Sequence, residues 1–209
     1  MPTNFPTSVD AFTNPISNDS LNSPSHSLQH ANANDAIEAV EDYLLNGAGK
    51  SGLVFIKTVT VGSGVSSVPV TDVFSSTYDN YRVVIGGVDA SSSPTNLRVQ
   101  FGSTANEHYG SQYFDFYGAS NTGTERVVNA ASLLIGITGT NDDTNVSFDV
   151  FCPNLVKRTI VAGNYDSFAY AGFFGGGVNT TTQYTSFNLL VGSGTITGGT
   201  IKVYGYRNA

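Results

Sequence analysis

The chain has 209 residues, of which 40% are hydrophobic, so it is long and apolar enough to form one sizeable core. Charged residues make up only 12%, and the formal net charge is −7. Nucleic-acid binding is disfavoured because phosphate contacts need a basic patch, and one cysteine, Cys152, excludes an internal disulfide. We also expect no signal peptide and no membrane insertion, since the sequence shows neither a basic leader nor a long apolar run.

Residues 1–29 predict an extended arm rather than a folded segment. This segment is polar and interrupted by prolines, and its apolar side chains are too sparse to offset the entropy cost of ordering the chain. Such a segment is either disordered or bound along another protein. In the second case Phe5, Phe12 and Ile16 are the expected anchoring side chains.

Residues 30–46 carry the one convincing helix signal. Asn34 or Asp35 can accept hydrogen bonds from free backbone N–H groups at its start, acidic residues follow, and Gly47 can adopt the left-handed conformation that ends a helix. We therefore expect one short α-helix between the arm and the remainder of the chain.

The helix carries a narrow apolar seam formed by Ala33, Ile37, Val40 and Leu44, at successive spacings of 4, 3 and 4 residues. A helix this short is only marginally stable by itself, so the seam must pack against another protein surface. It either docks on its own domain or bundles with copies of itself. The β-branched residues favour a trimer over a dimer, and the prediction is that the seam is the oligomerisation surface, although its length does not fix the number of copies.

Residues 47–52 form a glycine-rich hinge, and from residue 53 the apolar period changes to 2, which indicates β-strands. In the run from Val146, for example, Val146, Phe148 and Val150 share one face. The predicted strands cover residues 53–61, 67–70, 81–88, 96–101, 112–117, 131–137, 145–152, 157–162, 167–174, 184–191 and 200–206.

About ten short strands without an intervening helix predict a mainly β domain over residues 53–209, a jelly-roll-like antiparallel β-sandwich. Hairpin turns are expected at residues 140–143 and 192–194. Residues 172–177, two phenylalanines among glycines, are read either as a flexible contact loop or as a strand end followed by a turn.

The search for chemistry selects no catalytic residue. Asp142 and Asp143 have oxygens that suit calcium, but Asn and Asp are also common in turns, and the turn interpretation is preferred. Glu107 beside His108 is the only acid close to a histidine, which does not make a zinc site. We therefore expect no enzyme activity, metal or cofactor.

Three N-terminal segments form a recognisable pattern: the leader from Phe5 to Asp10, His30-Ala31, and the run from Asn34 to Glu41. This pattern resembles proteins associated with tail fibres and baseplates of tailed bacteriophages. Further on, Phe101-Gly102 and the glycine-rich approach to the last strand look like sandwich domains of phage virion proteins. The resemblance implies homotrimers whose arms bind other virion proteins and whose sandwiches face outward.

The resulting hypothesis is a non-enzymatic virion protein, a trimeric tail fibre or fibre-like protein that contacts the host surface, with a host surface glycan as a candidate partner. One alternative within this class is a capsid decoration or cement protein. An alternative of another class is a carbohydrate-binding module or a glycan-acting enzyme.

Overall fold

The computed structural model describes residues 26–45, 52–103, 106–118 and 122–208. The chain divides into two compact units, Met1–Gly52 and Leu53–Ala209. In the described residues the first unit contributes one α-helix and the second contributes strands only. The protein is therefore mainly β, and the second unit is an antiparallel β-sandwich, as the sequence predicts.

The helix, α1, covers His26–Leu45 and begins four residues before the predicted start at His30. Asn34 and Asp35 lie inside it, so the predicted N-terminal cap is wrong, and the first turn carries no acidic residue. No proline or glycine separates His26 from the seam, and exposed Asn and Asp cost a helix interior only a few tenths of a kcal/mol to about 0.7 kcal/mol each. Gly47, the expected terminator, lies outside the described residues.

The strands of the second unit are short and follow one another through turns and loops. They are β1 Leu53–Thr60, β2 Ser63–Val65, β3 Ser67–Val70, β4 Asn80–Ala90, β5 Thr95–Gln100, β6 Glu107–Asp115, β7 Thr122–Ala130, β8 Leu133–Thr138, β9 Thr144–Phe151, β10 Ile160–Asp166, β11 Tyr170–Val178, β12 Phe187–Val191, β13 Ile196–Thr197 and β14 Thr200–Tyr206.

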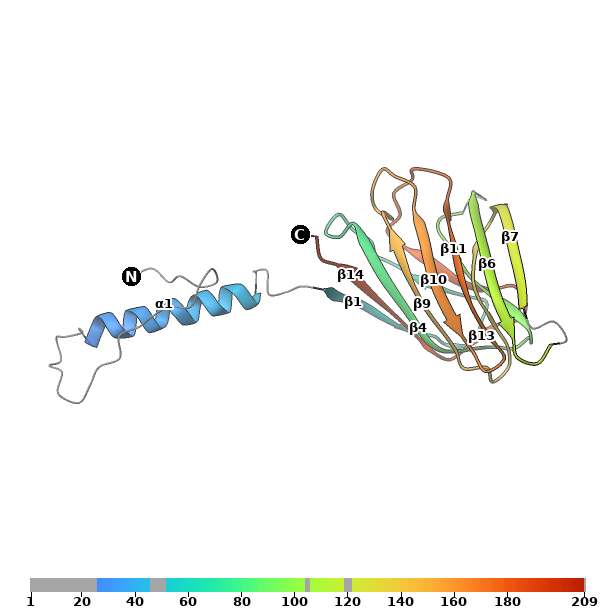
Figure 1. Ribbon diagram of the computed structural model, residues 1–209, viewed down its shortest axis with the longest axis horizontal. Coiled ribbons are helices and arrows are strands. Elements are labelled where there is room, and N and C mark those ends of the chain that lie inside the picture. Colours follow the sequence, from blue (N-terminus) through green and yellow to red (C-terminus); the bar gives the residue numbers. More distant parts are fainter. Residues whose placement is uncertain (1–25, 46–51, 104–105, 119–121, 209) are drawn as a thin grey trace. The chain divides into compact units, whose positions relative to one another are not determined.

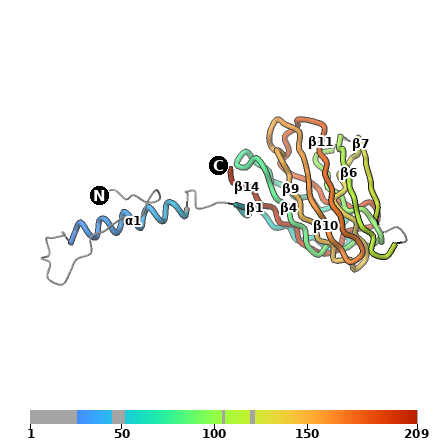
Figure 2. Tube along the Cα trace, viewed as in Figure 1, coloured from blue at the N-terminus to red at the C-terminus, as the bar shows by residue number. Residues whose placement is uncertain are grey.

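The strands form two antiparallel sheets. The larger has the order β1-β14-β4-β9-β10-β11-β6-β7, with β13 pairing β4 and β2, and the smaller has the order β3-β12-β5-β8. Figure 1 shows β4, β9, β10, β11, β6 and β7 side by side across the larger sheet. In Figure 2 the green β6 lies next to the orange β11, so segments far apart in the sequence share one surface.

The core lies between the two sheets and follows the alternation of each strand. On β9, for instance, Val146, Phe148 and Val150 are buried while the residues between them are more exposed. Phe148 of the larger sheet makes an edge-to-face contact with Phe187 of the smaller sheet, with ring centroids 6.5 Å apart. A two-layer sandwich is what this one-sided burial requires.

An aromatic cluster forms part of the core. Phe74 packs against Tyr81, Phe101 and Phe187, with centroid distances between 4.8 and 6.2 Å. The Tyr81 hydroxyl donates to the Ser75 carbonyl oxygen at 2.8 Å and accepts from the Ser75 N–H at 2.7 Å. The one polar atom of the buried ring is thus satisfied at both its donor and its acceptor site.

Three local expectations are wrong. The turns at residues 140–143 and 192–194 are not hairpins, because β8 and β12 belong to the smaller sheet while β9 and β13 belong to the larger one. Residues 172–177 are neither a loop nor a strand end, since they lie inside β11, which pairs with β10 and β6. A hypothetical Cβ at Gly176 would lie 2.4 Å from the His108 carbonyl oxygen, so glycine there permits close strand packing rather than flexibility.

Candidate functional site

The predicted oligomerisation seam is exposed along α1. The exposed fractions of Ile37, Val40 and Leu44 are 57%, 40% and 60%, and Ala33 is also exposed. The structure therefore presents an exposed apolar stripe along α1. Because the helix begins at His26, the same 4-3 spacing extends upstream through His30 to His26.

The two histidines at the start of α1 contact each other. Their Nε2 atoms are 3.1 Å apart, and the rings meet edge to face with centroids 4.4 Å apart. They occupy seam positions, so any partner helix on the seam would meet polar rings at this end and aliphatic side chains at the other. The anchoring residues Phe5, Phe12 and Ile16 lie outside the described residues, and the arm stays a prediction.

The Asp142 and Asp143 segment is a turn held by a third carboxylate. Asp89 Oδ1 accepts hydrogen bonds from the N–H groups of Asp142 and Asp143, at 2.8 and 2.9 Å. Burial and the Asp89 charge raise the pKa of Asp142. In the described part of the chain no three His, Cys, Asp or Glu residues gather in a way that would hold a metal ion. These hydrogen bonds make the segment a turn, and the Oδ2 atom of Asp142 is buried without a hydrogen-bond partner in the described structure.

Glu107 is the buried acid that sequence reasoning did not identify. Its side chain is 0% exposed, and Oε1 accepts a hydrogen bond from the Phe101 N–H at 3.0 Å, which ties β6 to the end of β5. Burial raises its pKa from 4.5 to about 7 despite the hydrogen bond and nearby Arg98. A perturbed acid often marks an active site, but this one points into the core and lines neither of the two surface hollows described below.

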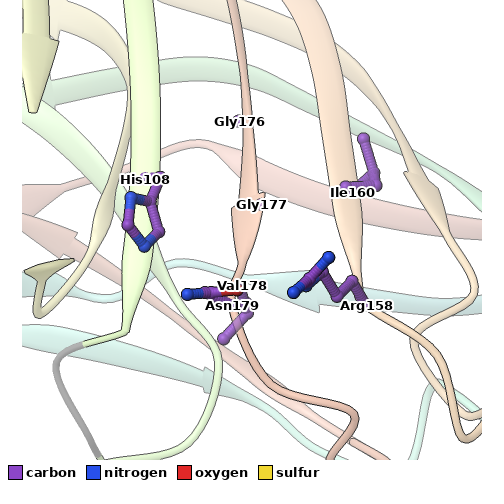
Figure 3. Close-up of a pocket in the computed structure, with 7 residues that line it drawn as sticks. All are labelled: His108, Arg158, Ile160, Gly176, Gly177, Val178 and Asn179. Carbon is purple, nitrogen blue, oxygen red and sulfur yellow. The ribbon is translucent and has the colours of Figure 1, made fainter. Parts of the chain in front are cut away.

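The sequence-distant residues His108, Arg158 and Asn179 line a hollow on the outer face of the larger sheet. Its volume is about 410 Å³, and Gly176 and Gly177 of β11 form its floor. In Figure 3 the His108 ring stands on β6 and Arg158 reaches from the β10 side, with the bare backbone of the two glycines between them. Ile160 and Val178 add apolar wall.

A second hollow adjoins the first at His108 and Gly176. It has a volume of about 440 Å³ and is lined on its far side by Arg126 and Val128 of β7. We call the two hollows together the cationic groove. Among the described residues that line it, none has a carboxylate side chain.

The groove exists because glycines replace side chains on the outward positions of two neighbouring strands. Gly175 of β11 pairs with Gly110 of β6, and hypothetical Cβ atoms there would meet nothing closer than 3.8 and 3.7 Å, respectively. The Nε2 atom of His108 is buried and has no hydrogen-bond partner in the described structure. Open space, a polar atom without a partner and two exposed arginines thus occur together.

Comparisons with known proteins identify no relative. No protein-family model matches the chain, and neither a curated protein nor a solved structure matches it. Among the described residues no helix is long and apolar enough to cross a membrane.

Proposed function

We propose that this chain is a non-enzymatic structural protein of a tailed-phage virion, a homotrimeric tail fibre or fibre-like protein. In this proposal residues 1–29 attach the chain to other virion proteins, α1 forms the trimeric stalk, and the sandwich faces outward for host-surface contact. The description of the sandwich as a jelly roll belongs to the same proposal.

The observation that carries the proposal is the exposed seam of α1. Burying a Leu or Ile side chain contributes about 1.5–3 kcal/mol, so an exposed stripe containing Ile37, Val40 and Leu44 favours association with a matching surface. A second copy of the helix offers that surface with the same 4-3 spacing. The link to phage particles rests on the resemblance of the N-terminal sequence to tail-fibre and baseplate-associated proteins.

The non-enzymatic part of the proposal is supported by the position of Glu107, a carboxyl group whose pKa lies near neutrality. Glu107 is sealed in the core, where a substrate has no access to it. General acid or base catalysis requires the group to reach the proton that it transfers.

The anchor is tested in a phage whose genome encodes this chain. Deletion of residues 1–25, which leaves α1 whole, should abolish attachment of the protein to particles, measured by immunogold labelling and by co-sedimentation. Circular dichroism checks that the truncated chain still folds. Labelling restricted to tails supports the fibre assignment, and labelling over the head supports the decoration-protein alternative. Unchanged attachment of the truncated chain contradicts the role of the arm.

A further inference from the structure

We propose that the cationic groove binds an acidic oligosaccharide, a chain of sugars carrying carboxylate or phosphate groups at intervals. The proposal specifies the host-surface contact of the proposed function and rests on it for its biological setting, but binding to the groove can be measured whatever the oligomeric state.

The charge of the groove is opposite to that of the chain as a whole. The chain has a formal net charge of −7, yet Arg126, Arg158 and His108 line the groove, and none of its described lining residues has a carboxylate side chain. The ion pair found among the described residues joins Arg82 and Asp149 at 3.9 Å, and neither residue lines the groove. Two exposed arginines without a carboxylate partner can form charge-assisted hydrogen bonds with a ligand's anionic groups.

The spacing of the arginines indicates a ligand with separated charges. Through the register, Arg126 aligns with Gly110, Gly175 and Ala162, three strand spacings away, and Arg158 lies four residues before Ala162. With strands about 4.8 Å apart and a rise of about 3.3 Å per residue, the two arginine Cα atoms are roughly 20 Å apart. This distance is too long for both guanidinium groups to hold one phosphate or carboxylate.

The lining favours a saccharide over other chain-like anions. The groove lies over strands whose backbones are already paired on both sides along β11, so an added peptide strand would find no free ladder there. Nucleobases bind by stacking on aromatic rings. Among the described residues that line the groove, Tyr109 is the only Trp, Tyr or Phe, and its side chain is buried and points into the core. Ile160, Val128 and the Asn179 amide instead offer the mixed apolar and hydrogen-bonding surface that sugar rings use.

The test is titration of the full chain with a soluble hexameric oligogalacturonate, followed by isothermal calorimetry at low salt. A neutral malto-hexaose of the same length is the control ligand. We expect saturable binding of the acidic hexamer that weakens with added salt, and no measurable binding of the neutral one. A phosphate-bearing teichoic-type oligomer of the same length distinguishes phosphate from carboxylate as the preferred group.

Variants locate the binding. Arg126→Ala and Arg158→Ala should each weaken it by about fivefold or more, since each removes a charge-assisted contact. Gly175→Val should also abolish it, because the added side chain occupies the groove and its Cβ meets only the Val161 carbonyl oxygen at 3.8 Å. Lys202→Ala removes an exposed positive charge on β14, outside the groove, and should change affinity by less than about twofold.

Three results would overturn the proposal. The first is binding of the neutral hexamer with the same affinity as the acidic one. The second is an equal loss of affinity in the Lys202 and arginine variants. The third is full displacement of the acidic oligomer by equimolar inorganic phosphate, which would indicate a site for single anions. Thermal melting checks that each variant folds, and if Gly175→Val does not, the arginine variants decide. Because a short soluble ligand occupies one protomer at a time, a seam variant such as Ile37→Asp should leave this affinity unchanged, so failure of the trimer and failure of the groove are distinguishable.

Discussion

Replacing Glu107 by glutamine should make the protein more stable at pH 8 and leave its stability nearly unchanged at pH 5. The carboxyl group is fully buried, its Oε1 accepts one backbone hydrogen bond, and its Oε2 has no partner among the described residues. Glutamine keeps the shape and an acceptor oxygen, and it cannot ionise. The substitution therefore removes the cost of a buried charge with little change in packing.

The magnitude follows from proton linkage. The pKa of Glu107 is about 7 in the folded chain against an ordinary value of 4.5. Between these values the folded state holds a proton that the unfolded state has released, so stability is highest at low pH and is lost as the pH rises through this window. One pKa unit corresponds to about 1.4 kcal/mol, so the wild-type chain should lose about 2–3 kcal/mol from this group between pH 5 and pH 8.

The assay is urea unfolding of both chains at pH 5, 6, 7 and 8, with the difference in unfolding free energy plotted against pH. Comparing the two chains cancels the titration of all other groups. Asp166→Asn, which neutralises an exposed carboxylate on β10, is the control and should shift stability by less than about 0.5 kcal/mol at every pH. A wild-type to Glu107→Gln difference that stays constant over this range would refute the reasoning.

Three further outcomes follow from the packing. Phe74→Ala should cost about 3–5 kcal/mol in urea unfolding because it empties the centre of the aromatic cluster, and a loss below about 1 kcal/mol would contradict that placement. Gly176→Ala should destabilise by about 1–3 kcal/mol through its clash with the neighbouring strand while Gly175→Ala stays within about 1 kcal/mol, and equal effects would contradict the strand orientation. Asp89→Asn should lower the pKa of Asp142, which burial and then the neighbouring charge raise, and an unchanged carboxyl titration by NMR would exclude that contact.

The sandwich was predictable because its strands bury one face. The predicted strands at residues 67–70 and 200–206 coincide with β3 and β14, and the alternation from Val146 identified β9 within one residue at each end. Apolar periodicity succeeds wherever one face packs on the core and the other meets solvent.

Two of the segments that sequence reasoning missed bury little or carry few side chains. β7, Thr122–Ala130, is an edge strand whose residues are all exposed or half-buried, so its sequence shows no alternation of apolar residues. The second half of β11 was read as loop or turn because Gly175, Gly176 and Gly177 have no side chain that could show a period. Only the pairing with β6 and β10 makes this run a strand.

The cationic groove could not have been predicted from local spacing. His108, Arg126 and Arg158 come from separate segments, and they share a surface only through the register of β7, β6, β11 and β10. The burial of Glu107 was not predicted for a different reason. Glutamate is rarely fully buried, and nothing in the neighbouring sequence marks this residue as an exception. The apolar seam of α1, by contrast, follows from the helical spacing alone, whereas its exposure is known only from the structure.

The most direct test of the account is the mass of the full chain in solution, measured by light scattering beside two variants of α1. The account predicts three times the 22.0 kDa chain mass for the wild type, and a lower mass for Ile37→Asp, which places a charge in the seam. Ala31→Asp places the same charge on an exposed position of the same helix outside the seam and should keep the trimer mass. A wild-type chain that has the mass of a monomer at every concentration would contradict the central claim.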